Sequence, residues 1–144
     1  MTGGADAQPS PAMLTDIDHV AIAVRDLDAA IEHYRTWFGA QLSHRERVES
    51  DAVEEALLQV GGSYVQLVCP TSADSPVAKF LDNKGEGLHH VGYRVADCAA
   101  ALQRVKDSGG KVIDHVPRPG SRGTTVAFVH PQGDLGTLVE LVQE

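Results

Sequence analysis

Apolar and polar residues alternate in two similar stretches of the chain, residues 17–24 and 88–95. Side chains of a β-strand alternate between its two faces, so Val20, Ile22 and Val24 share one face of the first stretch. The second stretch repeats this alternation 71 residues later. Each stretch is therefore predicted to be a strand that buries one face against a hydrophobic core.

A helical pattern follows each of these strands. After the first strand, apolar residues recur every three or four positions and stop before Gly39, a residue type that often ends helices. Asp26 or Asp28 is a suitable N-cap for this helix. After the second strand, Asp97 and the pair 109–110 take the corresponding places. The expected core stripes are Leu27, Ala30, Ile31, Tyr34 and Phe38 in the first helix, and Ala101, Leu102 and Val105 in the second.

The same order of elements recurs through the rest of the chain. Apolar stretches typical of strands follow each predicted helix, and residues 64–68 resemble residues 138–142. A fixed period of about 70 residues indicates an internal repeat. We therefore predict an α+β fold of two tandem βαβββ modules, related by pseudo-twofold symmetry, whose strands form a cupped sheet. The further strands are expected at about 52–60, 63–69, 124–130 and 136–143.

The repeat also sets the expected domain boundaries. Residues 1–13 are rich in Gly, Pro, Ala and Ser and are expected to form a disordered tail. One domain is predicted over residues 14–144, because a chain of 144 residues suits a single domain. Within it, module 1 is expected at about 14–70, a linker at about 71–86 and module 2 at about 87–143.

Four polar residues fall on the strand faces opposite the predicted core. His19 has Ala21 and Ala23 beside it on that face, and His90 takes the repeat-equivalent place next to Gly92. The last strand of each module adds one polar residue in the same phase. If the modules pack symmetrically, all four side chains converge on one point. The four residues are His19, Gln66, His90 and Glu140.

This set of side chains is typical of a metal site. Two imidazoles, one carboxylate and one amide oxygen suit a divalent Co, Mn, Ni, Zn or Fe(II) ion, and two octahedral positions stay open for a substrate. His89 is expected to point to the other face, in phase with Val91 and Tyr93. The other histidines lack a repeat partner and are expected to be structural or surface residues: His33, His44, His115 and His130.

Composition and charge exclude several classes of function. A net charge of -8 disfavours nucleic acids and anionic membranes as partners. No apolar run approaches the roughly 20 residues that span a bilayer, and the N-terminus has no signal-peptide pattern. Cys69 and Cys98 are expected to be unpaired thiols in a reducing compartment. These features favour a cytoplasmic protein that acts on a small molecule.

The motifs that open and close the modules resemble those of a known superfamily. The modules open with IDHVAIAV and GLHHVGYRV and close with YVQLV and LVELV. More specific stretches are DSPVAKFLDNKGEGLHHV at 74–91 and PRPGSRGTTVAFVHP at 117–131. Over about residues 14–143, the chain is similar to the vicinal oxygen chelate superfamily, and more narrowly to its methylmalonyl-CoA epimerases. The His, Gln, His, Glu order of the predicted ligands matches that of these epimerases.

The resemblance implies inversion at C2 of methylmalonyl-CoA, a reaction of propionate metabolism. Loss of the C2 proton would give an enolate that a metal ion, cobalt by preference, stabilises. Inversion needs one base on each face of the substrate. Alignment with the family glutamate on the strand after the first helix favours Glu55 over Glu54 as first base, and Glu55 points into the cleft if Leu58 faces the helix. Glu140 is implied as second base as well as metal ligand.

The resemblance also implies a homodimer, and it leaves the coenzyme A contacts open. The family often has a lysine after the His-Pro turn near the last hairpin, where this chain has Gln132. Contacts to coenzyme A are then expected from other cationic residues: Lys79, Lys84, Arg118 and Arg122.

Three other functions within the same superfamily compete with epimerisation. A glyoxalase I-type lyase, acting on a glutathione hemithioacetal, usually has a carboxylate where this chain has Gln66. An extradiol dioxygenase prefers two histidines and one carboxylate, so a fourth ligand argues against it. A non-catalytic protein that binds a small ligand would not need both a full ligand set and Glu55.

Overall fold

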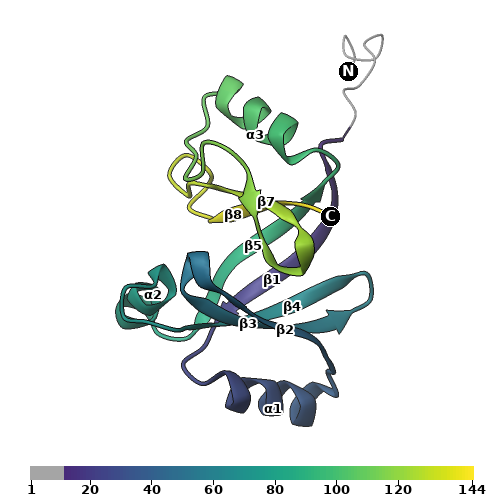
Figure 1. The fold of residues 1–144 in the computed structure, drawn as a ribbon, viewed down its shortest axis with the longest axis vertical. Coiled ribbons are helices and arrows are strands. Elements are labelled where there is room, and N and C mark those ends of the chain that lie inside the picture. The colour runs from purple at the N-terminus through teal and green to yellow at the C-terminus, as the bar shows by residue number, and fades with distance from the viewer. Residues whose placement is uncertain (1–11) are drawn as a thin grey trace.

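The computed structural model describes residues 12–144, which form one eight-stranded sheet and three α-helices (Figure 1). The strand order β2-β3-β4-β1-β5-β8-β7-β6 places the first four strands in one half of the curled sheet and the last four in the other. The strands are β1 (Leu14–Ala23), β2 (Leu42–Val48), β3 (Val53–Val60), β4 (Ser63–Pro70), β5 (Gly87–Val95), β6 (Arg118–Pro119), β7 (Thr125–Val129) and β8 (Val139–Gln143). The helices are α1 (Leu27–Phe38), α2 (Pro76–Lys84) and α3 (Cys98–Asp107), with 3-10 turns η2 (Glu49–Asp51) and η3 (Ser121–Gly123).

The pairing of the strands confirms the predicted repeat and α+β fold. β1 and β5, the opening strands of the two modules, pair antiparallel at the centre of the sheet. Each also pairs parallel with the last strand of its own module, β1 with β4 and β5 with β8. The modules differ at the sheet edges, where the seven-residue β2 of module 1 corresponds to only two residues, β6, in module 2.

Both repeat helices begin at an aspartate, as the sequence predicts. The Asp26 carboxylate accepts a hydrogen bond from the backbone N–H of Ala29 at 3.0 Å, and Asp97 does the same for Ala100. Asp26, rather than Asp28, is therefore the N-cap of α1. The helix ends at Gly39, whose φ of 66° places it in the left-handed region that glycine adopts without strain.

α1 and α3 cover the strand faces opposite the cleft and complete two separate cores. Leu27 of α1 packs with Leu58 and Leu67, and α3 packs its apolar side on β5, β7 and β8. The prediction that Phe38 belongs to the buried stripe of α1 is wrong. Phe38 is 65% exposed, because the last residue of the helix lies at a surface groove with Val60 rather than in the core.

The predicted linker contains a third helix that sequence analysis did not anticipate. Ser75 caps α2 by accepting a hydrogen bond from the Val77 N–H, and Pro76 occupies the first turn. Val77 and Leu81 pack into a cluster with Ala23 and neighbours on the cleft side of the sheet. The Ser-Pro pair, followed by apolar residues at helical spacing, was the available signal.

The chain ends and thiols add three observations. The predicted tail lies outside the described residues except for Ala12 and Met13, and Met13 packs against the α3 core. Cys69 and Cys98 are both unpaired, as predicted. Within residues 12–144, none of the helices has the length and apolar character needed to cross a bilayer.

Candidate metal centre

Three donor atoms from three strands meet in the cleft of the sheet. The Nε2 atoms of His19 on β1 and His90 on β5 are 3.1 Å apart. Oε1 of Glu140 on β8 lies 3.0 Å from the first nitrogen and 3.1 Å from the second. Each of the three residues is no more than 9% exposed. We call these atoms the donor triad, and the three residues form a group that could hold a metal ion.

The spacing of the donor triad suits an octahedral divalent ion. Adjacent ligands of an octahedral shell lie about 3.0 Å apart when the metal–ligand bonds are about 2.1 Å, whereas a tetrahedral shell with the same bonds separates them by about 3.4 Å. The observed edges of 3.0 and 3.1 Å match one face of the octahedron. The nitrogen and oxygen donors also fit a borderline or hard cation.

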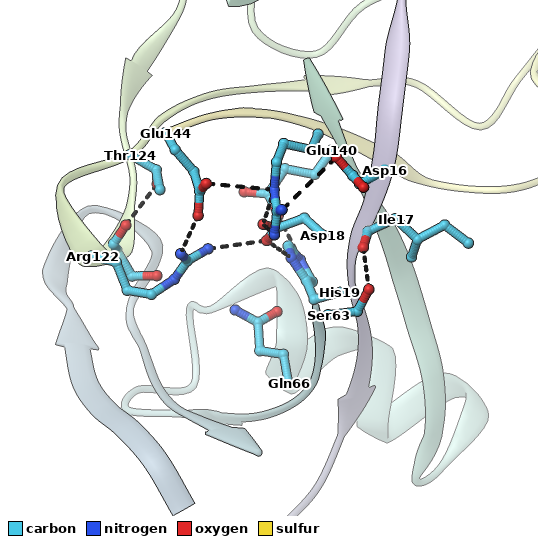
Figure 2. Close-up of polar contacts among 12 residues, drawn as sticks. Asp16, Ile17, Asp18, His19, Ser63, Gln66, Arg122, Thr124, Glu140 and Glu144 are labelled. Atoms are coloured by element: carbon cyan, nitrogen blue, oxygen red, sulfur yellow. Dashed lines mark hydrogen bonds and ion pairs between the residues drawn. The ribbon is translucent and has the colours of Figure 1, made fainter. Parts of the chain in front are cut away.

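Gln66 brings an oxygen to the same cleft. Its Nε2 donates to Glu55 Oε2 at 2.6 Å, which fixes the orientation of the amide. Its Oε1 is buried and has no hydrogen-bond partner among the described residues. A buried carbonyl oxygen without a partner is unfavourable unless an ion or water contacts it. Gln66 lines the same cleft as the donor triad and lies beside His19 in Figure 2, so its oxygen fits a fourth ligand.

A network of charged residues contacts His19 at Nδ1, the ring nitrogen that does not belong to the triad (Figure 2). The His19 Nδ1–H donates to Asp18 Oδ2 at 2.7 Å, and because an ionised carboxylate only accepts, the neutral form of the ring has its lone pair on Nε2, toward the triad. Asp18 is fully buried and is bound by Arg94 at 2.8 Å and Arg122 at 3.0 Å. Arg122 also reaches Glu144 at 3.2 Å, which ties the loop before β7 to the end of the chain. Sequence analysis missed this network, because its partners lie 76 and 104 residues from Asp18.

His90 is supported differently, and here a sequence prediction is wrong. The register between β1 and β5 jumps from Ala21↔His90 to Ile22↔Leu88, so His89 has no partner in β1. This bulge brings the His89 side chain to the cleft side, where it lines the cavity. Its Nδ1 lies 2.8 Å from His90 Nδ1. Strict alternation predicts that His89 lies on the other face of the strand. The bulge at this one unpaired residue interrupts the alternation, so His89 and His90 both face the cleft.

Burial and charge shift the pKa values of the triad in opposite directions. Burial opposes ionisation of Glu140, but the close contacts with His19 and His90 outweigh it and hold the pKa of this carboxyl well below its usual range. Burial also disfavours a charged His19, yet Asp18 and Glu140 raise the pKa of that imidazole to about 9. The two carboxylates on either side of His19 therefore favour positive charge at the triad.

Small residues across the strand pair make room for the imidazoles. His19 stands opposite Gly92, and His90 stands opposite Ala21. A Cβ atom on Gly92 would lie 2.3 Å from His19 Cε1, so no larger residue fits without moving the ring. The sequence indicated space beside each histidine along its own strand, whereas the structure supplies it from the neighbouring strand.

The chain is similar to known proteins over most of its length. Residues 18–128 match the glyoxalase/bleomycin resistance protein/dioxygenase superfamily. The ethylmalonyl-CoA/methylmalonyl-CoA epimerase of Cereibacter sphaeroides is 37% identical over 133 residues, which cover 91% of this chain and 99% of that protein. The chain belongs to the methylmalonyl-CoA epimerase family of this superfamily.

Solved structures of the epimerase family share the fold as well. A variant of the Streptomyces coelicolor methylmalonyl-CoA epimerase in complex with 2-nitronate-propionyl-CoA has a TM-score of 0.89 and 42% identity, and the match covers 91% of this chain and 95% of that chain. Variants of that protein in complex with the same ligand are substituted at a glutamate, a glutamine and a serine. A probable lactoylglutathione lyase of Synechocystis is less similar, with 29% identity over 126 residues, 87% of this chain and 92% of that protein.

The structure distinguishes Glu54 from Glu55, the two glutamates considered for the first base, because only Glu55 lines the cleft. Glu55 is 3% exposed and lines the cleft, while Leu58 faces α1, as the phase argument required. Burial raises the pKa of Glu55, although the hydrogen bonds from Gln66 and Ser121 partly offset this. Glu54 lies on the opposite face and pairs with Arg45 at 2.9 Å.

The cleft of about 180 Å³ also contains two of the four cations considered for coenzyme A. Arg118 pairs with Asp51 at 2.9 Å and Asp114 at 3.0 Å, so its charge is balanced within the protein. Arg122 is balanced by the network described above. Lys79 and Lys84 lie exposed on α2, whose first residues, Pro76 and Val77, line the cleft.

Proposed function

We propose that this protein is a metal-dependent epimerase that interconverts (2R)- and (2S)-methylmalonyl-CoA by proton transfer at C2. The observation that carries the proposal is a buried set of four donors, the triad and Gln66 Oε1, in a chain of the epimerase family. His19, Gln66, His90 and Glu140 would hold one divalent ion. The ion is Co, Mn, Ni, Zn or Fe(II), and the family resemblance favours Co.

The ion, when bound, would act as a Lewis acid toward the thioester and carboxylate oxygens of the substrate and so make the C2 proton more acidic. The chain supplies orientation, desolvation and the proton transfers. The buried cleft excludes water from a charge that develops next to the thioester. Its acid–base groups lie on strands of the sheet, which would fix their positions relative to the substrate.

Glu55 is proposed as the first base and Glu140 as the second. A carboxylate is a weak base in water, and burial raises the pKa of Glu55 toward a more useful range. Glu140 directs Oε1 at both histidines, which leaves Oε2 available for a proton. The two glutamates come from different halves of the sheet, β3 and β8, and this supports roles on opposite faces of the substrate.

Glu49 competes with Glu55 for the role of first base. In the Streptomyces coelicolor variants, the substituted glutamate precedes the glutamine by 17 positions, and the serine follows it by 55. In this chain the same spacing selects Glu49, Gln66 and Ser121. Glu49 lies on η2 at the surface, where it pairs with Arg47 at 3.3 Å, whereas Glu55 is buried against the amide that orients Gln66.

Paired variants separate the two candidates. If Glu55 is the base, Glu55→Gln should keep metal content and reduce turnover by about 10²–10⁴-fold, while Glu49→Gln stays near wild type. Retained turnover in Glu55→Gln together with loss in Glu49→Gln would move the base to Glu49 and leave Glu55 to orient Gln66. Glu54→Gln, on the opposite face of the same strand, is the matched control.

The reaction itself is tested by deuterium exchange. Methylmalonyl-CoA incubated in heavy water with the protein should exchange its C2 proton, and a chelator should abolish the exchange. A parallel assay for isomerisation of a glutathione hemithioacetal tests the lyase alternative. Activity in that assay without C2 exchange would replace the proposed function, and a metal-free protein inactive in both would favour a ligand-binding role.

The family resemblance also supports a homodimer in the cytoplasm that acts in propionate metabolism. Light scattering coupled to size-exclusion chromatography tests the dimer, for which a mass of twice 15.3 kDa is expected.

A further inference from the structure

His89, which the predicted mechanism does not use, makes a contact that needs a chemical explanation. Its Nδ1 lies 2.8 Å from His90 Nδ1, and the two rings meet at 78° with centroids 5.1 Å apart. Two imidazole nitrogens at this distance share one hydrogen bond, so one nitrogen carries the proton and the other accepts it. The contact therefore couples the tautomers of the two rings.

The direction of this hydrogen bond decides what His90 presents to the donor triad. If His90 Nδ1–H donates, His90 Nε2 has a lone pair directed at His19 Nε2 and Glu140 Oε1. If His89 donates instead, the proton of a neutral His90 is on Nε2, and that nitrogen cannot bind a metal. An acceptor at His89 Nδ1 therefore selects the tautomer of His90 that serves as a ligand.

The position of His89 is itself fixed. The bulge in β5 turns its side chain into the cleft, and its ring packs edge-on against Phe80 of α2 with centroids 4.9 Å apart. Phe80 belongs to the cluster that Val77 and Leu81 form with the sheet. The helix in the predicted linker thus packs against the ring of His89.

We infer that His89 is a positioning residue, whose Nδ1 accepts the Nδ1–H of His90 and holds His90 in the tautomer that binds the metal. The inference rests on the proposed metal centre. It assigns a task to the bulge and to α2, neither of which contributes a ligand. His89 would act only through His90 and does not belong to the donor triad.

Two substitutions at this position separate hydrogen bonding from packing. His89→Phe keeps an aromatic ring against Phe80 and removes the acceptor, whereas His89→Asn keeps an acceptor on a shorter side chain. Competitive titration of the purified full chain with Co²⁺ should show an affinity about 10–100-fold lower for His89→Phe, with most of the loss recovered in His89→Asn. Thermal unfolding of the metal-free proteins reports whether either variant disturbs the fold.

A second measurement reads the tautomer directly. In the Zn²⁺-loaded protein with ¹⁵N-labelled histidine, long-range proton–nitrogen spectra should show His90 protonated at Nδ1 and His89 protonated at Nε2. A His90 protonated at Nε2 in the loaded wild type would overturn the inference. So would equal Co²⁺ affinities of wild type and His89→Phe, or a His89→Asn variant as weak as His89→Phe. Wild-type protein that binds neither ion would instead remove the metal centre on which the inference rests.

Discussion

The two histidines of the donor triad occupy equivalent places in the two modules, yet the protein supports them in different ways. His19 donates to Asp18, a buried carboxylate bound by two arginines. His90 contacts His89, an imidazole that rests on Phe80. Burial and the neighbouring His90 lower the pKa of His89 to about 4, so this partner is neutral at pH 7.

The contrast shows what an internal repeat preserves. Strand pairing and the capped helices recur because each module must bury the same kind of face, and this places both histidines at the centre of the sheet. The partners behind the histidines do not recur. A carboxylate partner makes His19 the more basic of the two rings. His90 has a neutral partner, His89, and its tautomer depends on the one proton that the two Nδ1 atoms share.

Removing either histidine of the donor triad has the largest expected effect and tests whether the two halves contribute equally to metal binding. His90→Ala and His19→Ala should each lower bound metal to near zero in purified protein, because two of the three triad atoms cannot form the octahedral face. Elemental analysis gives the stoichiometry. Unchanged metal content in His90→Ala would defeat the site, whereas retention in only one variant would show that the halves are unequal. His130→Ala, outside the triad, is the control.

Removing the charge of Asp18, the partner of His19, is expected to reduce both the stability of the protein and its metal affinity. Asp18→Asn leaves Arg94 and Arg122 without their buried partner and should lower the free energy of unfolding at pH 7 by about 3 kcal/mol. The metal affinity should fall about 10–100-fold. Urea unfolding of the metal-free protein and Co²⁺ titration measure the two effects. Asp16→Asn, whose carboxylate is 3.9 Å from Arg94 and half-exposed, should change little.

The effect of Asp18→Asn should depend on pH in a defined direction. Hydrogen bonds and charge from His19 and the arginines outweigh burial and lower the pKa of Asp18 below 3.8, the ordinary value. A carboxyl with a lowered pKa in the folded state stabilises the fold above its unfolded pKa, and this contribution is lost as pH falls through the folded value. The stability difference between wild type and variant should therefore be constant near neutrality and shrink below about pH 4. A difference that grows in acid would contradict the assignment.

A steric change at the strand pair should have the smallest effect. Gly92→Ala places a Cβ atom against the His19 ring and should lower metal affinity by about tenfold, with a stability loss of about 1–3 kcal/mol. Gly62→Ala, where nothing lies within 4 Å of the added Cβ, should match wild type in both measurements. Equal behaviour of the two variants would show that the His19 ring has room to move.

Much of the site follows from periodicity alone. The period-2 alternation put His19 and Gln66 on the face opposite Leu67, and the repeat added His90 and Glu140 at equivalent positions. The phase of β3 put Glu55 in the cleft only if Leu58 faces the helix, and the structure meets this condition. These assignments succeed because neighbouring side chains of a regular strand must alternate, whatever the rest of the fold does.

The sequence by itself thus determined the repeat, the α+β class, the approximate starts of the two repeat helices and the four polar residues that face the cleft. Only the tertiary structure decided that β5 bulges at His89, that Phe80 of α2 packs against the His89 ring and that Arg94 and Arg122 bind Asp18. The reason is physical. Alternation and capping act over a few residues, whereas a register shift and a buried ion pair depend on strands and loops that are distant in the chain and meet only when the sheet closes.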